Sequence, residues 1–280
     1  MNIFKTTVLL TGLTLILVLA GEFFGGESGA LLAFGLAAIM NFFSYFFSDK
    51  LALRMYSAQA ATREQLPRVY EIVERLTRNA GIPMPKIYVI PTGSPNAFAT
   101  GRNPQHASVA VTQGILGLLT DDELEGVLAH ELGHVRNRDI LTSSIAATLA
   151  GAITILARMA FWFGGRRREG GLIGSLLMLI LAPLAAMLIQ MWVSRTREFA
   201  ADASAAELTH NPYALASALE KISGMSRQVP LEASASSAHM FIIAPLLNGQ
   251  NFANLFSTHP PVQKRIERLI GRPSVYGSLQ

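Results

Sequence analysis

The chain has 280 residues, of which 50% are hydrophobic and 15% are charged, whereas soluble globular chains carry about 25% charged residues. The deficit lies in long apolar runs and indicates a membrane protein. The net charge of +4 is modest, and the basic residues lie mostly beside those runs or in short amphipathic stretches, which argues against a nucleic-acid-binding face. The absence of cysteine excludes disulfides and cysteine-liganded metals, so any metal must bind histidines and carboxylates.

Four apolar segments are long enough, or nearly so, to cross a bilayer as helices, which takes about 20 residues. They are residues 6–20, 29–47, 140–163 and 172–193. The first also resembles a signal peptide, because Lys5 precedes a short apolar core, but no clear small-residue cleavage site follows it. We therefore expect an uncleaved hairpin of two helices over residues 1–48 and a second apolar hairpin over 140–193.

Basic flanks predict the orientation of the first hairpin. Lys5 precedes it and Lys50 follows it, whereas its connection contains Glu22 and Glu27 and no lysine or arginine. By the positive-inside rule, the N-terminus and everything after Lys50 lie in the cytoplasm. The second hairpin fits this rule less well, because its connection contains three arginines, at 166–168. It either spans the membrane at a cost or forms a shallow, partly soluble pair.

The polar residues between the hairpins predict short elements of mixed type. Apolar spacing indicates a helix over Glu64–Asn79, and short strands are expected over Lys86–Ile90 and Ala107–Thr112. Thr120 can cap a further helix that runs to about Arg138, because a glutamate stands three residues later as in a capping box.

That capped helix carries the pattern His-Glu-x-x-His at His130, Glu131 and His134. Two histidines four residues apart project from one helical face and can bind one tetrahedral Zn²⁺. Glu131 can then act as the general base that removes a proton from the attacking water. Two surface histidines on an amphipathic helix are the alternative explanation.

A catalytic zinc needs a third protein ligand, and no third histidine follows at the metzincin spacing, so a carboxylate is expected. Glu198 is the best candidate, and Asp202, one turn later, would accept the second ring N–H of a ligand histidine. An ion pair of Glu198 with Arg195 on a solvated helix is the alternative. Glu198 follows the second hairpin and His134 precedes it, and an even number of crossings returns both to one face of the membrane.

Taken together, these residues resemble the HtpX-type membrane zinc metalloproteases, relatives of the CAAX prenyl endoproteases. The matching pieces are the paired N-terminal segments, His-Glu-Leu-Gly-His at 130–134 with Val-Arg-Asn-Arg-Asp at 135–139, the apolar hairpin, Arg-Glu-Phe at 197–199 through Asp202, and Ser-Thr-His-Pro at 257–260. The resemblance implies Glu198 as third ligand of one zinc per chain. It also implies a multi-pass protein of the bacterial inner membrane that disposes of damaged membrane proteins under stress, alongside other quality-control proteases.

Two further stretches are candidates for a role at the site. Asn96, Ala97 and Phe98 are similar to the stretch that binds an extended substrate as an added strand in glutamate-liganded zinc peptidases; an ordinary turn is the alternative. His259 precedes an expected basic helix over Val262–Gly271, and in relatives this histidine lies close to the active site. It could stabilise the oxyanion of the tetrahedral intermediate or cover the metal, or be a buried structural histidine.

Other interpretations of the motifs remain open at this point. Glu207 and His210 form a second Glu-x-x-His, and two such motifs occur in di-iron carboxylate oxidoreductases built on four-helix bundles. The strand signals and the doubled histidine of the first motif argue against that class. A zinc-bearing membrane scaffold without catalysis is a third hypothesis, against which the intact Glu131 speaks.

We therefore expect a mainly α fold with a small β-sheet. A zincin-like peptidase domain would be formed by residues 49–139 and 194–280, with four hydrophobic helices in residues 1–48 and 140–193. The expected reaction is zinc-dependent endoproteolysis of unfolded or membrane-associated polypeptides at the bilayer. The sequence contains no Walker-type phosphate loop, so substrates must arrive unfolded or be unfolded by a partner.

Overall fold

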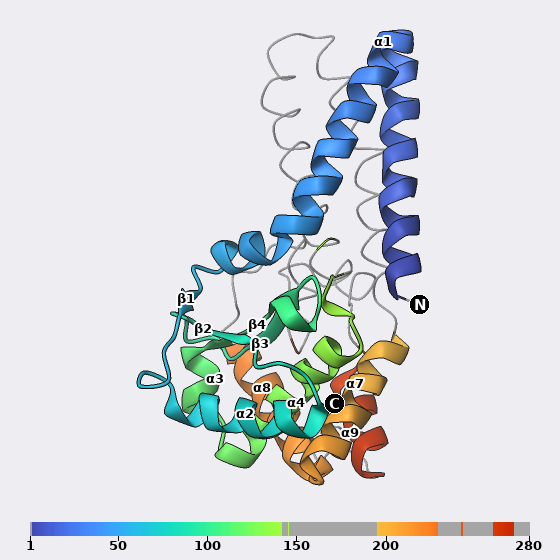
Figure 1. Ribbon diagram of the computed structural model, residues 1–280. Coiled ribbons are helices and arrows are strands. Elements are labelled where there is room, and N and C mark those ends of the chain that lie inside the picture. The colour runs from blue at the N-terminus through green and yellow to red at the C-terminus, as the bar shows by residue number, and fades with distance from the viewer. Residues whose placement is uncertain (1, 142–144, 146–194, 229–241, 243–259, 272–280) are drawn as a thin grey trace.

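The computed structural model describes residues 2–141, 145, 195–228, 242 and 260–271 (Figure 1). The second expected apolar hairpin, residues 140–193, lies outside this part of the chain apart from residues 140, 141 and 145. The described residues form a mainly helical protein with one small four-stranded sheet, as the sequence predicts.

The N-terminal helix α1 (Asn2–Met55) turns back on itself at Gly26, where the backbone adopts φ 59°. Figure 1 shows its two legs running side by side away from the rest of the protein. Gly21 and Gly29 face each other across the turn, and a Cβ at either position would overlap the carbonyl of the other. Glycine therefore permits both the positive φ and the close approach of the two legs.

The second leg of α1 is the part that is best suited to a membrane. Gly25–Met55 is the one helix within the described residues that is long and apolar enough to cross a bilayer, with a mean hydropathy of 1.8. Leu10–Leu19, in the first leg, is a shorter apolar stretch. The side-chain amide of Asn41 donates a hydrogen bond of 2.9 Å to the Thr14 hydroxyl, which ties the legs together. Of the four predicted hydrophobic helices, the described residues therefore contain one clear candidate.

The sheet has the strand order β1-β2-β4-β3, with β1 at Gln59–Ala60, β2 at Lys86–Ile90, β3 at Ala97–Gly101 and β4 at Ala107–Thr112. Strands β2 and β4 are parallel and agree with the predicted strands, whereas β3 pairs antiparallel with β4 and forms one edge of the sheet. The stretch around Phe98 is therefore an edge strand, and the alternative of an ordinary turn is wrong.

The helices around the sheet are α2 (Pro67–Ala80), α3 (Gln113–Leu118), α4 (Asp121–Arg136), α7 (Arg195–Thr209), α8 (Pro212–Gln228) and α9 (Val262–Ile270). Helix α2 begins three residues later than predicted, because Pro67, which lacks an N–H, occupies its first turn. Helix α4 begins after Thr120 as predicted, and it contacts α2, α7, α8 and β3. The polar stretches before and after residues 140–193 thus share one core around α4.

Both faces of the sheet are covered, which explains why every residue of β4 is buried. One face carries Ile87, Val109 and Val111 into the main core with α4. On the opposite face, Phe98 packs with Ala52 and Leu53 from the last turns of α1. The C-terminal end of the N-terminal hairpin is therefore part of the core of the domain.

Candidate metal centre

The start of helix α4 is fixed by a complete capping box. The Thr120 hydroxyl accepts a hydrogen bond from the Glu123 backbone N–H, and the Glu123 carboxylate accepts one from the Thr120 N–H. Ser217 and Lys221 of α8 also donate to this carboxylate, at 2.6 and 2.7 Å. Burial acts to raise the pKa of Glu123, but these donors outweigh it and lower the pKa to about 2. The carboxylate thus caps α4 and joins it to α8.

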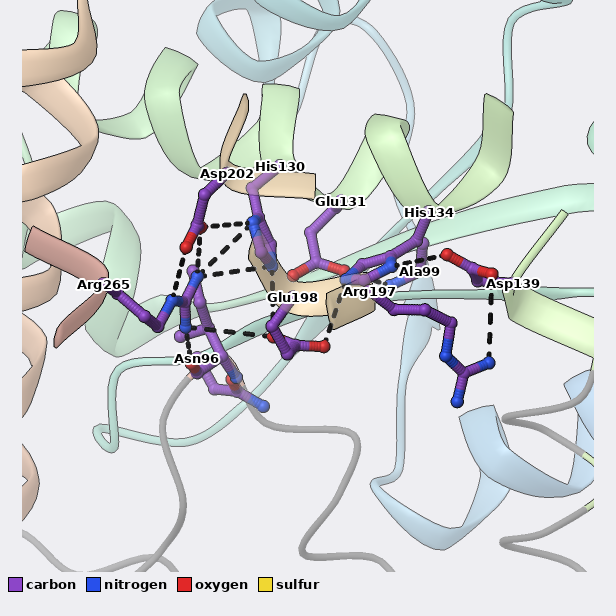
Figure 2. Close-up of polar contacts among 11 residues, drawn as sticks. Asn96, Ala99, His130, Glu131, His134, Asp139, Arg197, Glu198, Asp202 and Arg265 are labelled. Atoms are coloured by element: carbon purple, nitrogen blue, oxygen red, sulfur yellow. Dashed lines mark hydrogen bonds and ion pairs between the residues drawn. The ribbon is translucent and has the colours of Figure 1, made fainter. Parts of the chain in front are cut away.

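His130 and His134 of α4 meet Glu198 of α7 in a cluster that could hold a metal ion (Figure 2). One ligand atom from each residue lies within 4.8 Å of the others. The Glu198 carboxylate oxygens lie 3.7 Å from Nε2 of His130 and 3.6 Å from Nε2 of His134. Two ligand atoms that share a tetrahedral Zn²⁺ at about 2.1 Å each would be about 3.4 Å apart. The donor set and its spacing therefore fit a zinc ion.

The three predicted ligands are brought together from two separate stretches of the chain. Glu198 is only 8% exposed, so the alternative of an ion pair on a solvated helix is wrong. The alternative of two surface histidines is also wrong. The side chains of His130 and His134 are 1% and 16% exposed, and both rings face Glu198.

Asp202 lies where the sequence predicts it, beside the first histidine. Its carboxylate is 2.9 Å from Nδ1 of His130, so Nε2 of that ring points to Glu198. Burial and the positive charge of Arg265 lower the pKa of His130 to about 4, although Asp202 acts in the opposite direction. The imidazole is therefore neutral at physiological pH, which is the form that binds a metal.

Arg265 of α9 is a member of this cluster that sequence reasoning missed. It is fully buried, and it donates hydrogen bonds of 2.9 and 2.6 Å to the two oxygens of Asp202 and one of 2.7 Å to the Ile242 carbonyl. A signal was present in the sequence, because Arg265 lies on the same helical face as Val262 and Leu269. An arginine on the apolar face of a short helix needs a buried carboxylate partner.

His134 has a similar arrangement with a different carboxylate. Its Nδ1 lies 3.4 Å from Asp139, which is 4% exposed, and Arg197 approaches the other Asp139 oxygen at 3.8 Å. Burial acts to lower the pKa of His134, but Asp139 and Glu198 outweigh it and raise the pKa to about 9. A metal at Nε2 of His134, the ring nitrogen that faces Glu198, therefore competes with a proton for the imidazole. Sequence analysis assigned no role to Asp139.

Glu131, the predicted general base, lies beside the cluster and against the edge strand. Its carboxylate accepts a hydrogen bond of 2.9 Å from the Ala99 backbone N–H of β3. Burial raises the pKa of Glu131 to about 7, and the charge of Glu198 acts in the same direction while His134 opposes it. A carboxylate with a pKa near 7 is suited to accept and return a proton at physiological pH.

The predicted substrate-binding stretch, Asn96 to Phe98, runs into the start of β3. Its backbone and side-chain groups point in different directions. The Thr112 N–H donates to the Asn96 carbonyl, and alternate residues of an antiparallel strand face its partner. Ala97 and Ala99 therefore direct their backbone groups to the outer edge. The Asn96 side-chain oxygen accepts a hydrogen bond from the Ile242 N–H at 3.1 Å, and the Phe98 side chain packs toward α1.

The structure describes one of the two other candidate histidines. His259 lies outside the described residues. The second Glu-x-x-His lies on the surface, where His210 is exposed and Glu207 pairs with Arg136 at 3.4 Å. This position does not support the di-iron alternative, which needs both motifs to face one interior.

Comparison with known proteins agrees with this geometry. The model of peptidase family M48 matches residues 63–272. A protein described as "Protease HtpX homolog" from Syntrophobacter fumaroxidans is 54% identical over 276 residues, which cover 95% of this chain and 98% of that protein. Another of the same description, from Persephonella marina, is 54% identical over 289 residues and the full length of both chains.

A solved structure shares the fold at much lower sequence identity. The crystal structure of S. mikatae Ste24p superposes with a TM-score of 0.55 at 19% identity, over 96% of this chain and 65% of the other. This chain thus spans 65% of the length of that protein, and the likeness speaks to the fold alone. The family match and the full-length relatives decide the classification: the chain belongs to peptidase family M48.

Proposed function

We propose that the protein is a membrane-bound, zinc-dependent endopeptidase that cleaves unfolded or damaged polypeptides, including membrane proteins. The observation that carries this proposal is the meeting of His130, His134 and Glu198 beside the buried carboxylate of Glu131. Membership of a peptidase family favours it over both the di-iron oxidoreductase and the inactive scaffold.

In this proposal His130, His134 and Glu198 hold the zinc ion. When bound, zinc polarises the carbonyl of the scissile peptide and lowers the pKa of water. Glu131 accepts the proton of the attacking water and returns it to the leaving nitrogen, which its pKa of about 7 allows in both directions. Asp202 and Asp139 hold the two imidazole rings in orientation through Nδ1.

The substrate would add to the sheet as an extended strand at the outer edge of β3. The backbone groups of Ala97 and Ala99 point that way, and Glu131 already bonds to the Ala99 N–H at this edge. In this arrangement Asn96 and Phe98 support the strand, one through Ile242 and the other through α1. An unfolded chain offers an extended segment of this kind more readily than a folded domain does, so the site favours unfolded chains.

His259 is proposed to stabilise the oxyanion of the tetrahedral intermediate. It stands six residues before Arg265 in the sequence, and Arg265 lies against Asp202 at the metal cluster. Loss of an oxyanion donor lowers kcat by about 10²–10³-fold. His259→Ala should therefore lower kcat by that factor with zinc content unchanged, and a loss of zinc in the variant would show that this histidine is a ligand instead.

The proposed location is the bacterial inner membrane, with several spans, the active site in the cytoplasm, and other quality-control proteases as partners. The basic flanks at Lys5 and Lys50 support this orientation. Because the chain has no cysteine, single cysteines at positions 5 and 167 can be tested with a membrane-impermeant thiol reagent in intact cells. Labelling from outside at position 5 would contradict the orientation, and labelling at 167 would show that the second hairpin spans.

The direct test is cleavage of casein by the detergent-purified protein, with and without a chelator. Metal analysis should give about one zinc per chain, and two irons would support the oxidoreductase instead. Glu131→Gln should retain zinc and lose activity by about 10²–10⁴-fold, which makes it the matched control for cleavage by a contaminant. Glu198→Ala should lose zinc as His134→Ala does. An active Glu131→Gln protein would refute the mechanism.

A further inference from the structure

The second leg of α1 is longer than the hydrocarbon core of a membrane. Gly25–Met55 contains 31 residues, which at 1.5 Å per residue give about 46 Å, whereas the hydrocarbon core is about 30 Å thick. The last turns of the helix must lie outside it, and there Ala52 and Leu53 are 3% and 6% exposed in the core beneath the sheet. The helix therefore leaves the bilayer shortly before it meets the domain.

The point of exit is marked by aromatic side chains on the outside of the helix. Five of them occur within six residues and are between 39% and 55% exposed: Phe42, Phe43, Tyr45, Phe46 and Phe47. Exposed aliphatic residues such as Leu31 and Leu32, both 67% exposed, precede them along the leg. Tyrosine and tryptophan, whose rings have a polar group, gather at the boundary between hydrocarbon and headgroups, so Tyr45 marks this boundary and the phenylalanines beside it lie on its hydrocarbon side or at its level. Lys50 and Arg54 follow and are both exposed, as expected at a headgroup layer.

Arg102 of the peptidase domain lies at the same level as these aromatic side chains. It lies in the turn after β3, next to η1 (Pro104–His106), and its guanidinium lies 5.6 Å from the centre of the Phe46 ring. Lys50 is similarly placed, 5.3 Å from the Phe47 ring. A cation beside an interfacial aromatic ring has its charge at the depth of lipid phosphates. Asp49 is the acidic residue on this part of α1. Lys50, Arg54 and Arg102 outnumber it, so this region carries a net positive charge.

The sheet itself also lies close to this boundary. Phe98 of β3 packs on Leu53 and its ring centre lies 5.5 Å from that of Tyr56, so only the end of α1 separates β3 from the aromatic residues. An α-helix is about 10 Å across. The contact of Arg102 with Phe46 and the packing of Phe98 on α1 are separate observations, and both place the end of β3 next to the membrane surface.

We propose that Lys50, Arg54 and Arg102 form a docking surface for the headgroups of anionic lipids, which holds the outer edge of β3 against the membrane. Basic residues next to a membrane span are attracted to anionic lipid by about fivefold in affinity for each charge. Docking in this way presents β3 to a polypeptide segment as it leaves the bilayer. The consequence for substrates rests on the proposed function, whereas the lipid contact does not.

The lipid contact can be tested without any enzyme assay. Single cysteines replace Tyr45, Gln105 and Glu71 in the otherwise cysteine-free chain, are labelled with a nitroxide, and are studied in nanodiscs of phosphatidylglycerol and phosphatidylcholine. All three side chains are exposed, and Glu71 lies on α2. We expect the labels at 45 and 105 to be within a few ångströms of the phosphate level and the label at 71 to be in water. Equal water exposure at 105 and 71 would overturn the proposal.

The consequence for substrates needs a second experiment on the full chain. Cleavage of a membrane-protein substrate is compared between nanodiscs that contain phosphatidylglycerol together with phosphatidylcholine and nanodiscs of phosphatidylcholine alone. The ratio of the cleavage rate in anionic nanodiscs to that in neutral nanodiscs should fall about fivefold in Arg102→Gln. Arg102→Lys should keep the wild-type ratio. Arg78→Gln, at an exposed arginine on α2, should also behave as wild type. Casein cleavage in detergent should be unchanged in all three.

The two experiments separate the possible failures. If the labels report the phosphate level and no variant cleaves anything, the docking surface stands and the proposed function fails. If casein cleavage falls as much as membrane-protein cleavage in Arg102→Gln, Arg102 acts by supporting β3 and the proposal of lipid docking is wrong.

Discussion

At the level of single residues, both histidines of the candidate metal centre are held in the same way. Each ring contacts a buried carboxylate through Nδ1, and each carboxylate has an arginine beside it: Arg265 at Asp202, and Arg197 at Asp139. This leaves Nε2 of both rings directed to Glu198. The arrangement fixes the ring orientation before a metal binds, which reduces the ordering that binding requires.

The Asp139 contact should therefore affect how tightly the metal is held. Asp139→Asn keeps the size of the side chain and removes the charge behind His134, and changes of this kind weaken metal binding by about 10–100-fold. Competition with a chromogenic chelator would measure the zinc dissociation constant. Asp122→Asn, at an exposed position in the first turn of α4, is the matched control. An unchanged dissociation constant in Asp139→Asn would remove the proposed role.

Arg265 should matter for stability because it neutralises a carboxylate that is 3% exposed. Arg265→Met leaves Asp202 charged and buried without its partner, which costs about 3–5 kcal/mol. The double variant with Asp202→Asn should recover part of this loss, since no unpaired charge remains. Chemical unfolding of the detergent-solubilised protein measures both. A double variant that is less stable than Arg265→Met would show that the arginine acts through other contacts.

At the level of secondary-structure elements, helix α4 depends on its N-terminal cap. Glu123 is 6% exposed and accepts hydrogen bonds from Thr120, Ser217 and Lys221. Glu123→Gln should lower the free energy of unfolding by about 1–3 kcal/mol, because hydrogen bonds to a charged group are lost. Glu125→Gln, at a half-buried position on the same helix, is the comparison. It removes one surface ion pair to Arg75 and should lower the free energy of unfolding by less, about 0–1 kcal/mol.

The cap should also make stability depend on pH. The pKa of Glu123 is lowered in the folded protein from 4.5 to about 2, so its stabilising effect is complete above pH 4.5 and is lost as the pH falls toward 2. The difference in stability between wild type and Glu123→Gln should follow the same course, large at neutral pH and small near pH 2. A difference that did not change with pH would show that the charge of Glu123 is not its cause.

At the level of the whole molecule, the N-terminal hairpin is joined to the peptidase domain through the end of α1. Leu53→Ala should lower the free energy of unfolding by about 2–5 kcal/mol, because it leaves a cavity against Phe98 and Ala110. Leu51→Ala removes a side chain that is 43% exposed on the same helix and should have little effect. Thermal unfolding in detergent distinguishes the two, and equal losses would show that α1 is only an anchor.

Family membership is consistent with this view of the molecule. The match to family M48 begins at residue 63, after the end of α1, yet Ala52, Leu53 and Tyr56 pack on the sheet with Phe98. The hairpin and the peptidase domain therefore share a core at one face of the sheet, so a change in α1 can reach the edge strand that lies against Glu131.

The sequence by itself determined the local features of this protein. The spacing of His130, Glu131 and His134 on a capped helix predicted one metal-binding face, since i and i+4 positions are adjacent on any helix. Strands β2 and β4, and a turn between the two N-terminal apolar segments, also follow from local pattern. Glu198 was predicted as the third ligand because its residue type and its order in the chain restrict the choice, and the structure brings it next to both histidines.

Only the tertiary structure decided which distant residues complete the site. Arg265, Asp139 and Arg197 lie at positions whose partners are remote in sequence or are not fixed by helical spacing, and a single sequence contains no distance between elements. The edge position of β3 likewise depends on which strands pair with β4, which is set by the packing of both faces of the sheet. Local periodicity specifies the face of each element, whereas the burial of those faces against one another specifies the neighbours.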